Sequence, residues 1–308
     1  MKFCVKSFGC SANIAEGEII KGLLKQKNQV SEEDKAEVIV LNVCTVKGEN
    51  SAVKQIKKAM NANPAAKIVI TGCITKKLQE QFSDALFIST HNIDKVQEAI
   101  KTNQNFIKFK TLVKLGFPRV RENEVIGIIP ISSGCPDACT YCSTELIKGN
   151  LHSFPVKKIL EEAEKFIKQG CRELWITAQD TTCYGQDLNI NLAKLLKKII
   201  GIRGDFFIRI VMGHPRHLRN FWDEFVQVFR HPKVFKFLHL PIQSGNNMIL
   251  GAMKRNDSVE NFTKLVSDFR KEFPDATIST DIIVGFPGET EEQFNDSLNL
   301  IKKLNQMF

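Results

Sequence analysis

No stretch of this 308-residue sequence approaches the roughly 18 consecutive apolar residues that a membrane-spanning helix needs. The N-terminus also lacks the apolar core and small-residue cleavage site of a secretory signal peptide. Internal repeats, low-complexity tracts and long glycine–serine linkers are missing as well, which excludes repeat arrays and flexible spacers. We therefore expect a globular cytoplasmic protein without a membrane-spanning segment.

The composition is that of an ordinary globular protein with an excess of positive charge. Hydrophobic residues make up 43% and charged residues 25%, which suits one barrel-sized domain and a smaller one. The formal charge of +9 indicates a polyanionic partner, most simply nucleic acid, although it also serves solubility. In a reducing cytoplasm the nine cysteines favour metal or catalytic roles over disulfides.

Three of these cysteines share one loop. Cys135, Cys139 and Cys142 are spaced CxxxCxxC and follow the apolar run 125–129, which predicts a buried parallel strand. Iron–sulfur clusters are normally held by four cysteine thiolates, so a loop with three leaves one iron open to a substrate or cofactor. The alternatives are a zinc site with a fourth cysteine or histidine ligand and a chance cluster of cysteines.

The N-terminal region predicts a second set of three. Short apolar runs predict strands at 3–8, 38–43, 68–71 and 86–88, and helical patterns fall near 14–24, 50–60, 76–82 and 93–100. This alternation is typical of a parallel sheet with helices on its faces. Cys10, Cys44 and Cys73 follow the first three strands, and the carboxyl ends of parallel strands share one edge, where open α/β folds bind ligands. We therefore expect these thiols to converge at a second metal site.

The loop IPISSGCPDACTYC resembles the cluster loop of the radical S-adenosylmethionine (SAM) enzymes. In that superfamily the open iron of a [4Fe–4S] cluster binds the amino and carboxylate groups of SAM. The resemblance implies that Cys135, Cys139 and Cys142 are catalytic cluster ligands and that the backbone at Tyr141 lies along the SAM adenine. It also implies one-electron cleavage of SAM to methionine and a 5′-deoxyadenosyl radical.

The N-terminal blocks resemble a narrower family. GCSANIAEGE, LNVCTV and ITGC are similar to the GCxxNxxDxE, NxCxV and xxGCxx blocks of the radical SAM methylthiotransferases. That resemblance implies an auxiliary [4Fe–4S] cluster on Cys10, Cys44 and Cys73. Glu16 takes the place of the usual aspartate and keeps the carboxylate. Asn13 is expected to support the first cysteine loop, with helix capping as its alternative role.

Beyond the cysteine loop, strand and helix patterns alternate as in a β/α barrel. Strands are predicted at 173–177, 206–212, 235–240 and 277–284, and helices at 156–169, 191–200, 220–229, 259–273 and 291–304. With the strand before the loop, this makes five β/α repeats of a partly closed parallel barrel, whose chemistry should lie at the carboxyl ends of the strands. Radical SAM cores usually have six strands, and the sixth would begin about where this sequence stops.

The predicted strand ends carry further matches. TAQDTTCYG, RIVMGHPRH, KFLHLPIQSGNNMILGAMKR and STDIIVGFPGETEEQF resemble blocks of the methylthiotransferases, the last two most closely. The resemblance implies that the SAM pocket is lined by Gln179, Asp180, Arg209, His239, Pro241, Gln243, Ser244, Asp281, Gly285 and Glu289. From the residues alone, the turn at Gly285 permits a close backbone approach to a ligand. Asp281, inside an apolar strand, is expected to be a buried acid with a partner.

Two segments leave their roles open. The connector 101–125 interleaves basic residues such as Lys114 with phenylalanines, which predicts either RNA contacts or a hairpin with packed rings and solvated charges. After the cysteine loop the chain reads LIKGNLHSFP, where the family tends to read LARGRLRSYP. Lys148 therefore keeps a charge but not the bidentate fork of an arginine. His91 and His214 are expected at the surface or in turns.

The resemblance as a whole implies both a fold class and a function. We expect α/β, with an N-terminal parallel α/β domain of methylthiotransferase type at 1–105 and a partial (β/α) radical SAM barrel at 120–308, which lacks the sixth strand and the C-terminal TRAM domain. The blocks look most like those of archaeal and eukaryotic enzymes that methylthiolate N6-threonylcarbamoyladenosine at tRNA position 37. By family analogy, one SAM donates a methyl group to sulfur at the auxiliary cluster, and a second yields the radical that activates carbon 2 of the adenine.

The implied cofactors are two [4Fe–4S] clusters and SAM. The implied partners are the anticodon loop of tRNA, an electron donor and a separate C-terminal TRAM fragment, with no membrane. Two other functions stay open at this point. A methylthiotransferase acting on isopentenyladenosine or on a ribosomal protein shares both cluster motifs, and a non-catalytic iron–sulfur RNA-binding protein is compatible with the missing C-terminal domain.

Overall fold

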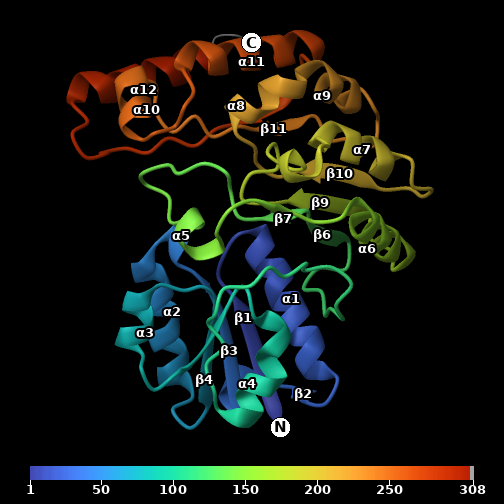
Figure 1. Cartoon of the computed structure of the whole chain (residues 1–308), viewed down its shortest axis with the longest axis vertical. Coiled ribbons are helices and arrows are strands. Elements are labelled where there is room, and N and C mark those ends of the chain that lie inside the picture. The colour runs from blue at the N-terminus through green and yellow to red at the C-terminus, as the bar shows by residue number, and fades with distance from the viewer. Residues whose placement is uncertain (306–308) are drawn as a thin grey trace. The chain divides into compact units, whose positions relative to one another are not determined.

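The computed structural model describes residues 1–305, and contacts within the chain divide it into two units (Figure 1). Unit 1 comprises Met1–Pro130 together with Leu146–Gly149, and unit 2 comprises Ile131–Glu145 and the chain from Asn150 onward. Across residues 1–305, no helix is both long enough and apolar enough to cross a membrane.

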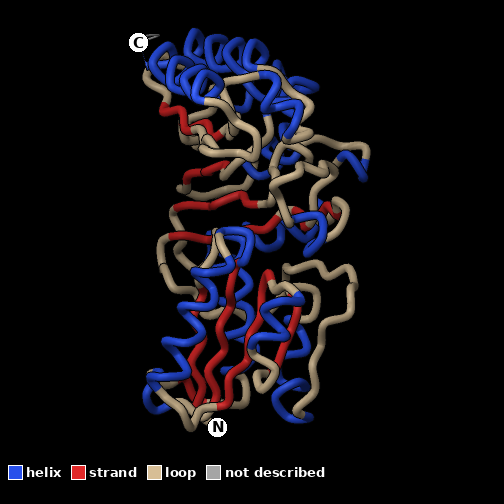
Figure 2. The backbone as a smooth tube through the Cα atoms, turned by 90° about the vertical axis from the view of Figure 1, so that its left-hand side faces the viewer, coloured by secondary structure: helices blue, strands red, loops and turns tan. Residues whose placement is uncertain are grey.

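Unit 1 contains a five-stranded sheet with the order β2-β1-β3-β4-β5, in which every neighbouring pair is parallel. Figure 2 shows its strands side by side in red. The strands are β1 (Lys2–Ser7), β2 (Gln29–Val30), β3 (Val38–Cys44), β4 (Lys67–Cys73) and β5 (Leu86–Ser89). The four strands predicted for this region are confirmed, and the short edge strand β2 is an addition.

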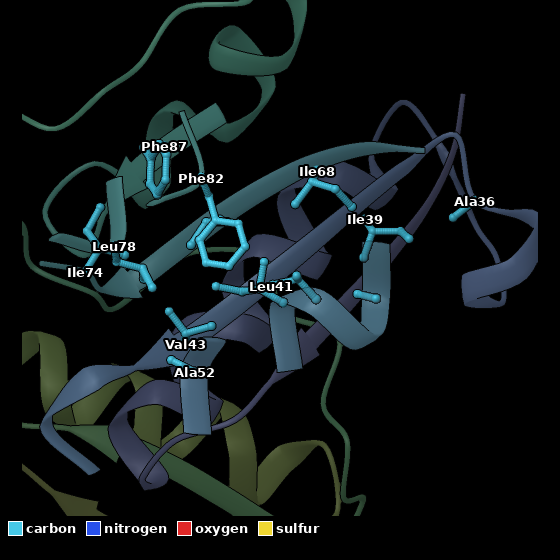
Figure 3. Packing of buried hydrophobic residues seen from close by; sticks show 13 residues of the cluster. Ala36, Ile39, Leu41, Val43, Ala52, Ile68, Ile74, Leu78, Phe82 and Phe87 are labelled. Atoms are coloured by element: carbon cyan, nitrogen blue, oxygen red, sulfur yellow. The ribbon is translucent and has the colours of Figure 1, made fainter. Parts of the chain in front are cut away.

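Helices cover both faces of this sheet because its central strands are apolar on both sides. Ile39, Leu41 and Val43 of β3 pack on one face with α2 (Glu49–Ala62) and α3 (Lys76–Gln81), as Figure 3 shows. Val38 and Val40 point to the other face, where they meet α1 (Ser11–Lys25) and α4 (Val96–Thr102). This alternation follows from the two-residue period of a strand. Short 3-10 turns occur at η1 (Glu33–Lys35), η2 (Thr45–Lys47) and η3 (Ile93–Lys95).

The connector after α4 forms no hairpin, so that interpretation is wrong. Phe106 pairs instead with the edge of the sheet, since its backbone exchanges hydrogen bonds of 2.9 Å with Phe87 and Ser89. The segment then runs on without regular structure until β6 (Ile126–Pro130). Lys114 is buried rather than solvated, with its side chain only 4% exposed. A single bridge between Phe106 and the edge strand β5 is therefore found in place of the hairpin.

Unit 2 contains four further parallel strands and their helices. β9 (Glu173–Thr177) pairs with β10 (Phe207–Ile210), and β11 (Phe237–His239) pairs with β12 (Thr277–Ser279). Hydrogen bonds from the Phe235 amide to the Ile208 carbonyl (3.0 Å) and from the Gly213 amide to the His239 carbonyl (3.1 Å) join β10 to β11. The last three strands are shorter than predicted: β10 and β12 lose residues mainly at their carboxyl ends, where the chain turns into loops, and β11 mainly at its amino end.

The five long helices predicted for this part of the chain are confirmed. They are α6 (Val156–Lys168), α7 (Leu192–Ile200), α9 (Trp222–Phe229), α11 (Val259–Glu272) and α12 (Glu291–Asn305). The sequence patterns missed short elements that lie mostly beside the strand ends: β7 (Ser132–Ser133), β8 (His152–Ser153), α5 (Thr144–Lys148), η4 (Gln186–Leu188), α8 (Pro215–Leu218), η5 (Arg219–Phe221) and α10 (Asn247–Ala252).

Candidate functional site

The three cysteines of unit 1 meet at one edge of the sheet. Cys10 precedes α1, and Cys44 and Cys73 are the last residues of β3 and β4, where they are register partners. β1 lies between β2 and β3 in the sheet. The connection after β1 therefore runs toward the β2 edge, and the connection after β3 runs toward the β5 edge. In open α/β sheets such a switch point forms the crevice that binds ligands. The topology confirms that β1, β3 and β4 end at one edge of the sheet, while the convergence of the three thiols at a metal site stays a prediction.

Polar side chains behind the cysteines fix the loop geometry. The Asn13 amide donates to Oδ1 of Asn42 (2.7 Å) and to the carbonyl of Val43 (3.2 Å), and the Asn42 amide donates back to the Asn13 carbonyl (2.6 Å). The Thr45 hydroxyl donates to the carbonyl of Cys73 at 2.8 Å. Asn13 thus joins α1 to the end of β3 and does not cap a helix.

Beside these loops lies a buried cluster of charges, which we call the lysine pair with Glu16. Lys114 and Lys148 both donate to Oε1 of Glu16, at 2.5 and 3.0 Å, and Thr90 donates to the same oxygen at 2.8 Å. Burial opposes the ionisation of Glu16, but the charges and hydrogen bonds of the two lysines prevail and lower its pKa to about 2. Burial and the neighbouring charge of Lys148 lower the pKa of Lys114 to about 8. Two cations and one anion therefore share this buried space near neutral pH.

The lysine that carries the unmatched positive charge interacts electrostatically with two of the cysteines. Burial alone would lower the pKa of Lys148, but its electrostatic interactions with Glu16, Cys73 and Cys10 raise it above the ordinary value. A hydrogen bond with Cys44, together with burial, raises the pKa of the Cys73 thiol. Thiols in this setting become thiolates when a metal binds them. An iron–sulfur cluster fits this donor set, because its thiolate ligands supply the negative charge that the lysine pair calls for.

The three cysteines of unit 2 lie in the loop between β7 and α5, and each is half-buried. Burial raises the pKa of the Cys135 thiol to about 12 and also raises that of Cys139. The Cys142 amide donates to the carbonyl of Cys139 at 3.0 Å, which folds the loop back on itself. This loop can present three soft sulfur ligands to one metal centre and contributes no fourth cysteine.

One group of side chains other than the cysteines has the close spacing of potential metal ligands. Within residues 1–305, the one group of three potential ligand atoms lying within 4.8 Å of one another belongs to Asp137, Asp180 and His217, and neither cysteine trio qualifies. That group is already an ion-pair network, in which His217 lies 2.7 Å from Asp137 and 3.8 Å from Asp180.

The cysteine loop of unit 2 is held from several sides. Arg216 and His217 contact the carboxylate of Asp137 at 3.0 and 2.7 Å. Farther along the loop, Arg255 donates to the Tyr141 hydroxyl at 2.7 Å and to the carbonyl of Pro241. These contacts tie the loop to segments that follow β10 and β11, where ligand-binding residues of a β/α barrel are expected.

Four of the predicted pocket residues stand at the ends of β9, β10 and β11. Gln179 accepts a hydrogen bond from the Gly134 amide of the cysteine loop (2.9 Å), and the buried Asp180 accepts from Thr182 (2.6 Å). The Arg209 guanidinium lies 4.6 and 4.7 Å from the ring centres of Trp175 and Phe237. His239 contacts Asp281 at 2.9 Å.

The expectation that Asp281 is buried is wrong. Its side chain is 57% exposed, because β12 ends at Ser279 and the acid stands beyond the strand. Its predicted partner exists, however, in His239. The carboxylate is therefore available at the open end of the barrel strands.

The remaining pocket candidates lie on the loops after β11 and β12. Gln243 has a φ of +78°, and its amide and carbonyl bond to Asp281 and Ile283, each at 2.9 Å. Ser244 is fully buried and accepts from Asn246 at 3.1 Å. Glu289 accepts from the Gly285 amide at 2.7 Å, and φ at Gly285 is +73°, a conformation that favours glycine.

Several residues of these sites escaped the sequence interpretation. His91 lies in a turn, as one of the two alternatives predicted, but both His91 and His214 are buried. The His91 ring bonds to the carbonyl of Ile147 at 2.9 Å. Arg255 ends one of the recognised blocks, so a signal for it existed, but nothing in the sequence assigned it a partner. The pairing of Asp137 with His217 had no sequence signal, since 80 positions separate the two residues.

The comparisons with known proteins place this geometry in a family. A family model described as the radical SAM superfamily matches residues 129–301, and one described as uncharacterized protein family UPF0004 matches residues 2–92. A probable threonylcarbamoyladenosine tRNA methylthiotransferase of Pyrococcus abyssi is 39% identical over 99% of this chain and 74% of its own length. The chain belongs to the threonylcarbamoyladenosine tRNA methylthiotransferase family. The human member of this methylthiotransferase family is 33% identical over 98% of the chain and 55% of its own length.

Solved structures agree on the fold of this methylthiotransferase family member. The radical SAM methyltransferase TsrM of Kitasatospora setae matches with a TM-score of 0.69 at 13% identity, covering 99% of this chain and 71% of TsrM. The cobalamin-dependent SAM radical enzyme OxsB matches with a TM-score of 0.62 at 9% identity, covering 97% of this chain and 51% of OxsB. At such identities the likeness shows the fold alone, and it confirms the predicted α/β class with a parallel sheet followed by a radical SAM barrel.

Proposed function

We propose that this chain converts N6-threonylcarbamoyladenosine at position 37 of tRNA to its 2-methylthio derivative. One observation carries the proposal: two separate sets of three cysteines stand at strand ends or in the loop beside them, in a chain of the threonylcarbamoyladenosine methylthiotransferase family. Each set offers three thiolates, which leaves one iron of a [4Fe–4S] cluster open. The two required cofactors are therefore a pair of such clusters and SAM.

In unit 2, Cys135, Cys139 and Cys142 would hold the cluster that binds SAM, which when bound supplies a 5′-deoxyadenosyl radical. The contact between Arg255 and Tyr141 fixes the backbone expected beside the SAM adenine. The pocket candidates are the residues that the sequence predicted: Gln179, Asp180, Arg209, His239, Pro241, Gln243, Ser244, Asp281, Gly285 and Glu289. The exposed carboxylate of Asp281 and the open turn at Gly285 leave room for the polar groups of SAM.

In unit 1, Cys10, Cys44 and Cys73 would hold the auxiliary cluster, at which sulfur is prepared for transfer. The reaction replaces the hydrogen on carbon 2 of the adenine by a methylthio group, so it needs one sulfur atom and one methyl group. A site with an open iron and two buried lysines in the neighbouring charge cluster suits the handling of an anionic sulfur species. We assign the two tasks to the two domains, at 1–105 and 120–308.

The partners follow from the reaction and from charge. A tRNA anticodon loop presents the target base, and the excess of nine positive charges attracts its phosphates. An electron donor must reduce the cluster in unit 2, and a separate TRAM fragment would add RNA affinity. We place the reaction in the cytoplasm, where tRNA and reducing conditions coexist.

The test is anaerobic reconstitution followed by incubation with tRNA, SAM and dithionite. Iron analysis should give about eight irons per chain, the content of two [4Fe–4S] clusters. Mass analysis of the digested tRNA should show 2-methylthio-N6-threonylcarbamoyladenosine. Methylthiolation of isopentenyladenosine in its place would contradict the assigned substrate, and two bound clusters without any modified nucleoside would favour an RNA-binding role.

A further inference from the structure

The effect of the lysine pair with Glu16 on the electron affinity of a cluster in unit 1 has not been considered so far. The side chains of Lys114, Lys148 and Glu16 are only 4%, 6% and 2% exposed. Both lysines also lie within hydrogen-bond distance of the Thr90 hydroxyl, at 2.6 and 3.3 Å. Such complete burial of two ammonium groups is rare, because charged side chains lose their hydration.

A buried charge needs a compensating anion, and Glu16 compensates only one of the two lysines. When a metal binds the cysteines of unit 1, their thiolates become anions beside this cluster, and Lys148 is close enough to Cys73 and Cys10 to interact electrostatically with both. The cluster of charges is also fixed to that edge of the sheet. The Thr90 amide donates to the carbonyl of Gly72 at 3.2 Å, one residue before Cys73, and Glu16 lies on the helix that Cys10 begins.

We propose that Lys114 and Lys148 act as the buried counter-charge of the cluster bound to Cys10, Cys44 and Cys73, and thereby raise the reduction potential of that cluster. The inference rests on the proposed function, because it requires a cluster at these cysteines. Reduction adds one electron to the cluster and makes it more negative. A fixed positive charge in a water-poor environment stabilises the reduced form more than the oxidised one.

The sequence gives no sign that the two lysines lie beside the cysteines of unit 1, because both come from segments distant in the chain. Lys114 lies in the connector, and Lys148 ends α5, the helix that follows the cysteine loop of unit 2. They are positioning residues of an electrostatic kind, which touch neither substrate nor reacting atoms. A purely structural role would be to pin these two segments to α1. Such a role predicts losses of stability but no change in potential, so the potential separates the two explanations.

The experiment uses the full chain with Cys135, Cys139 and Cys142 replaced by alanine, so that one cluster remains. The reconstituted protein is titrated anaerobically with dithionite in the presence of redox mediators, and the reduced cluster is counted by electron paramagnetic resonance. Lys148→Met and Lys114→Met remove one charge each. Lys148→Arg keeps the charge.

Lys110→Met is the matched control, because it removes a lysine of the same connector whose partner, Asp94, lies 2.7 Å away and whose side chain is 36% exposed. We expect the two buried-site methionine variants to lower the ratio of reduced to oxidised cluster at least tenfold at the midpoint of the parent, a shift of about 59 mV for one electron. Lys148→Arg and Lys110→Met should leave the ratio within threefold.

The possible failures are distinguishable. If the parent protein takes up no iron at Cys10, Cys44 and Cys73, the proposed function falls. If the cluster forms but Lys114→Met and Lys148→Met give the midpoint of Lys110→Met, the inference alone is overturned. Should Lys148→Met not fold, Lys114→Met decides by the same comparison.

Discussion

Replacing Glu16 by glutamine should destabilise unit 1 strongly while leaving unit 2 unchanged. Glutamine keeps the shape of the side chain but removes the one carboxylate that Lys114 and Lys148 share. Removal of one partner from a buried ion pair costs about 3–5 kcal/mol, because the other charge stays buried without compensation. The lowered pKa of Glu16 gives a similar free energy of stabilisation. Its decrease from 4.5 to about 2 corresponds to roughly 3 kcal/mol of stabilisation by the ionised form.

Hydrogen exchange measured by mass spectrometry is the suitable assay, since it reads each unit separately. In the metal-free protein, peptides covering β3 and β4 should exchange roughly two orders of magnitude faster in Glu16→Gln than in the parent at pH 7. Peptides covering β9 and β10 should exchange at the parental rate. Glu33→Gln is the control, because its partner Lys6 is 38% exposed and such pairs contribute about 1 kcal/mol or less.

The lowered pKa of Glu16 also predicts how the stability difference between parent and variant changes with pH. The pKa of Glu16 is lower in the folded protein than in the unfolded chain, so its stabilisation is complete above about pH 4.5 and is lost as the pH falls toward 2. The difference between parent and Glu16→Gln should therefore shrink on acidification below pH 4.5. Exchange rates for β3 and β4 within threefold of the parent at pH 7 would refute this account of the buried charges.

Three further predictions concern the unit 2 loop, SAM binding and tRNA binding. Arg255→Met should speed the loss of iron from the unit 2 loop to a chelator, because Tyr141 and Pro241 lose their shared donor; equal rates in parent and variant would argue against this support. His217→Ala should weaken SAM binding several-fold through release of Asp137, whereas His231→Ala should leave the affinity for SAM unchanged, as isothermal calorimetry can show. Transfer RNA should bind this chain with an affinity that falls steeply between 50 and roughly 200 mM salt and rises when a TRAM fragment is added; salt-insensitive nanomolar binding would contradict that expectation.

The cysteines were predictable because their signal is local. Cys44 and Cys73 each end an apolar run, and the carboxyl ends of parallel strands necessarily meet at one edge. The charges beside them were not, since Lys114 stands 98 positions from Glu16 and is joined to it only by the path of an irregular segment. The burial of Asp281 was predicted wrongly for a different reason. The sequence continues an apolar run to residue 284, but the strand ends earlier, and that end decides whether the acid is buried.

The division of labour between the two cysteine sets is the central claim, and one variant tests it most directly. Cys10→Ala/Cys44→Ala/Cys73→Ala removes the unit 1 ligands and leaves the unit 2 loop intact. Given dithionite, SAM and tRNA, the reconstituted variant should still release 5′-deoxyadenosine but form no 2-methylthio nucleoside, both measured by mass spectrometry. Formation of the methylthio nucleoside by this variant would contradict the role assigned to the N-terminal cysteines.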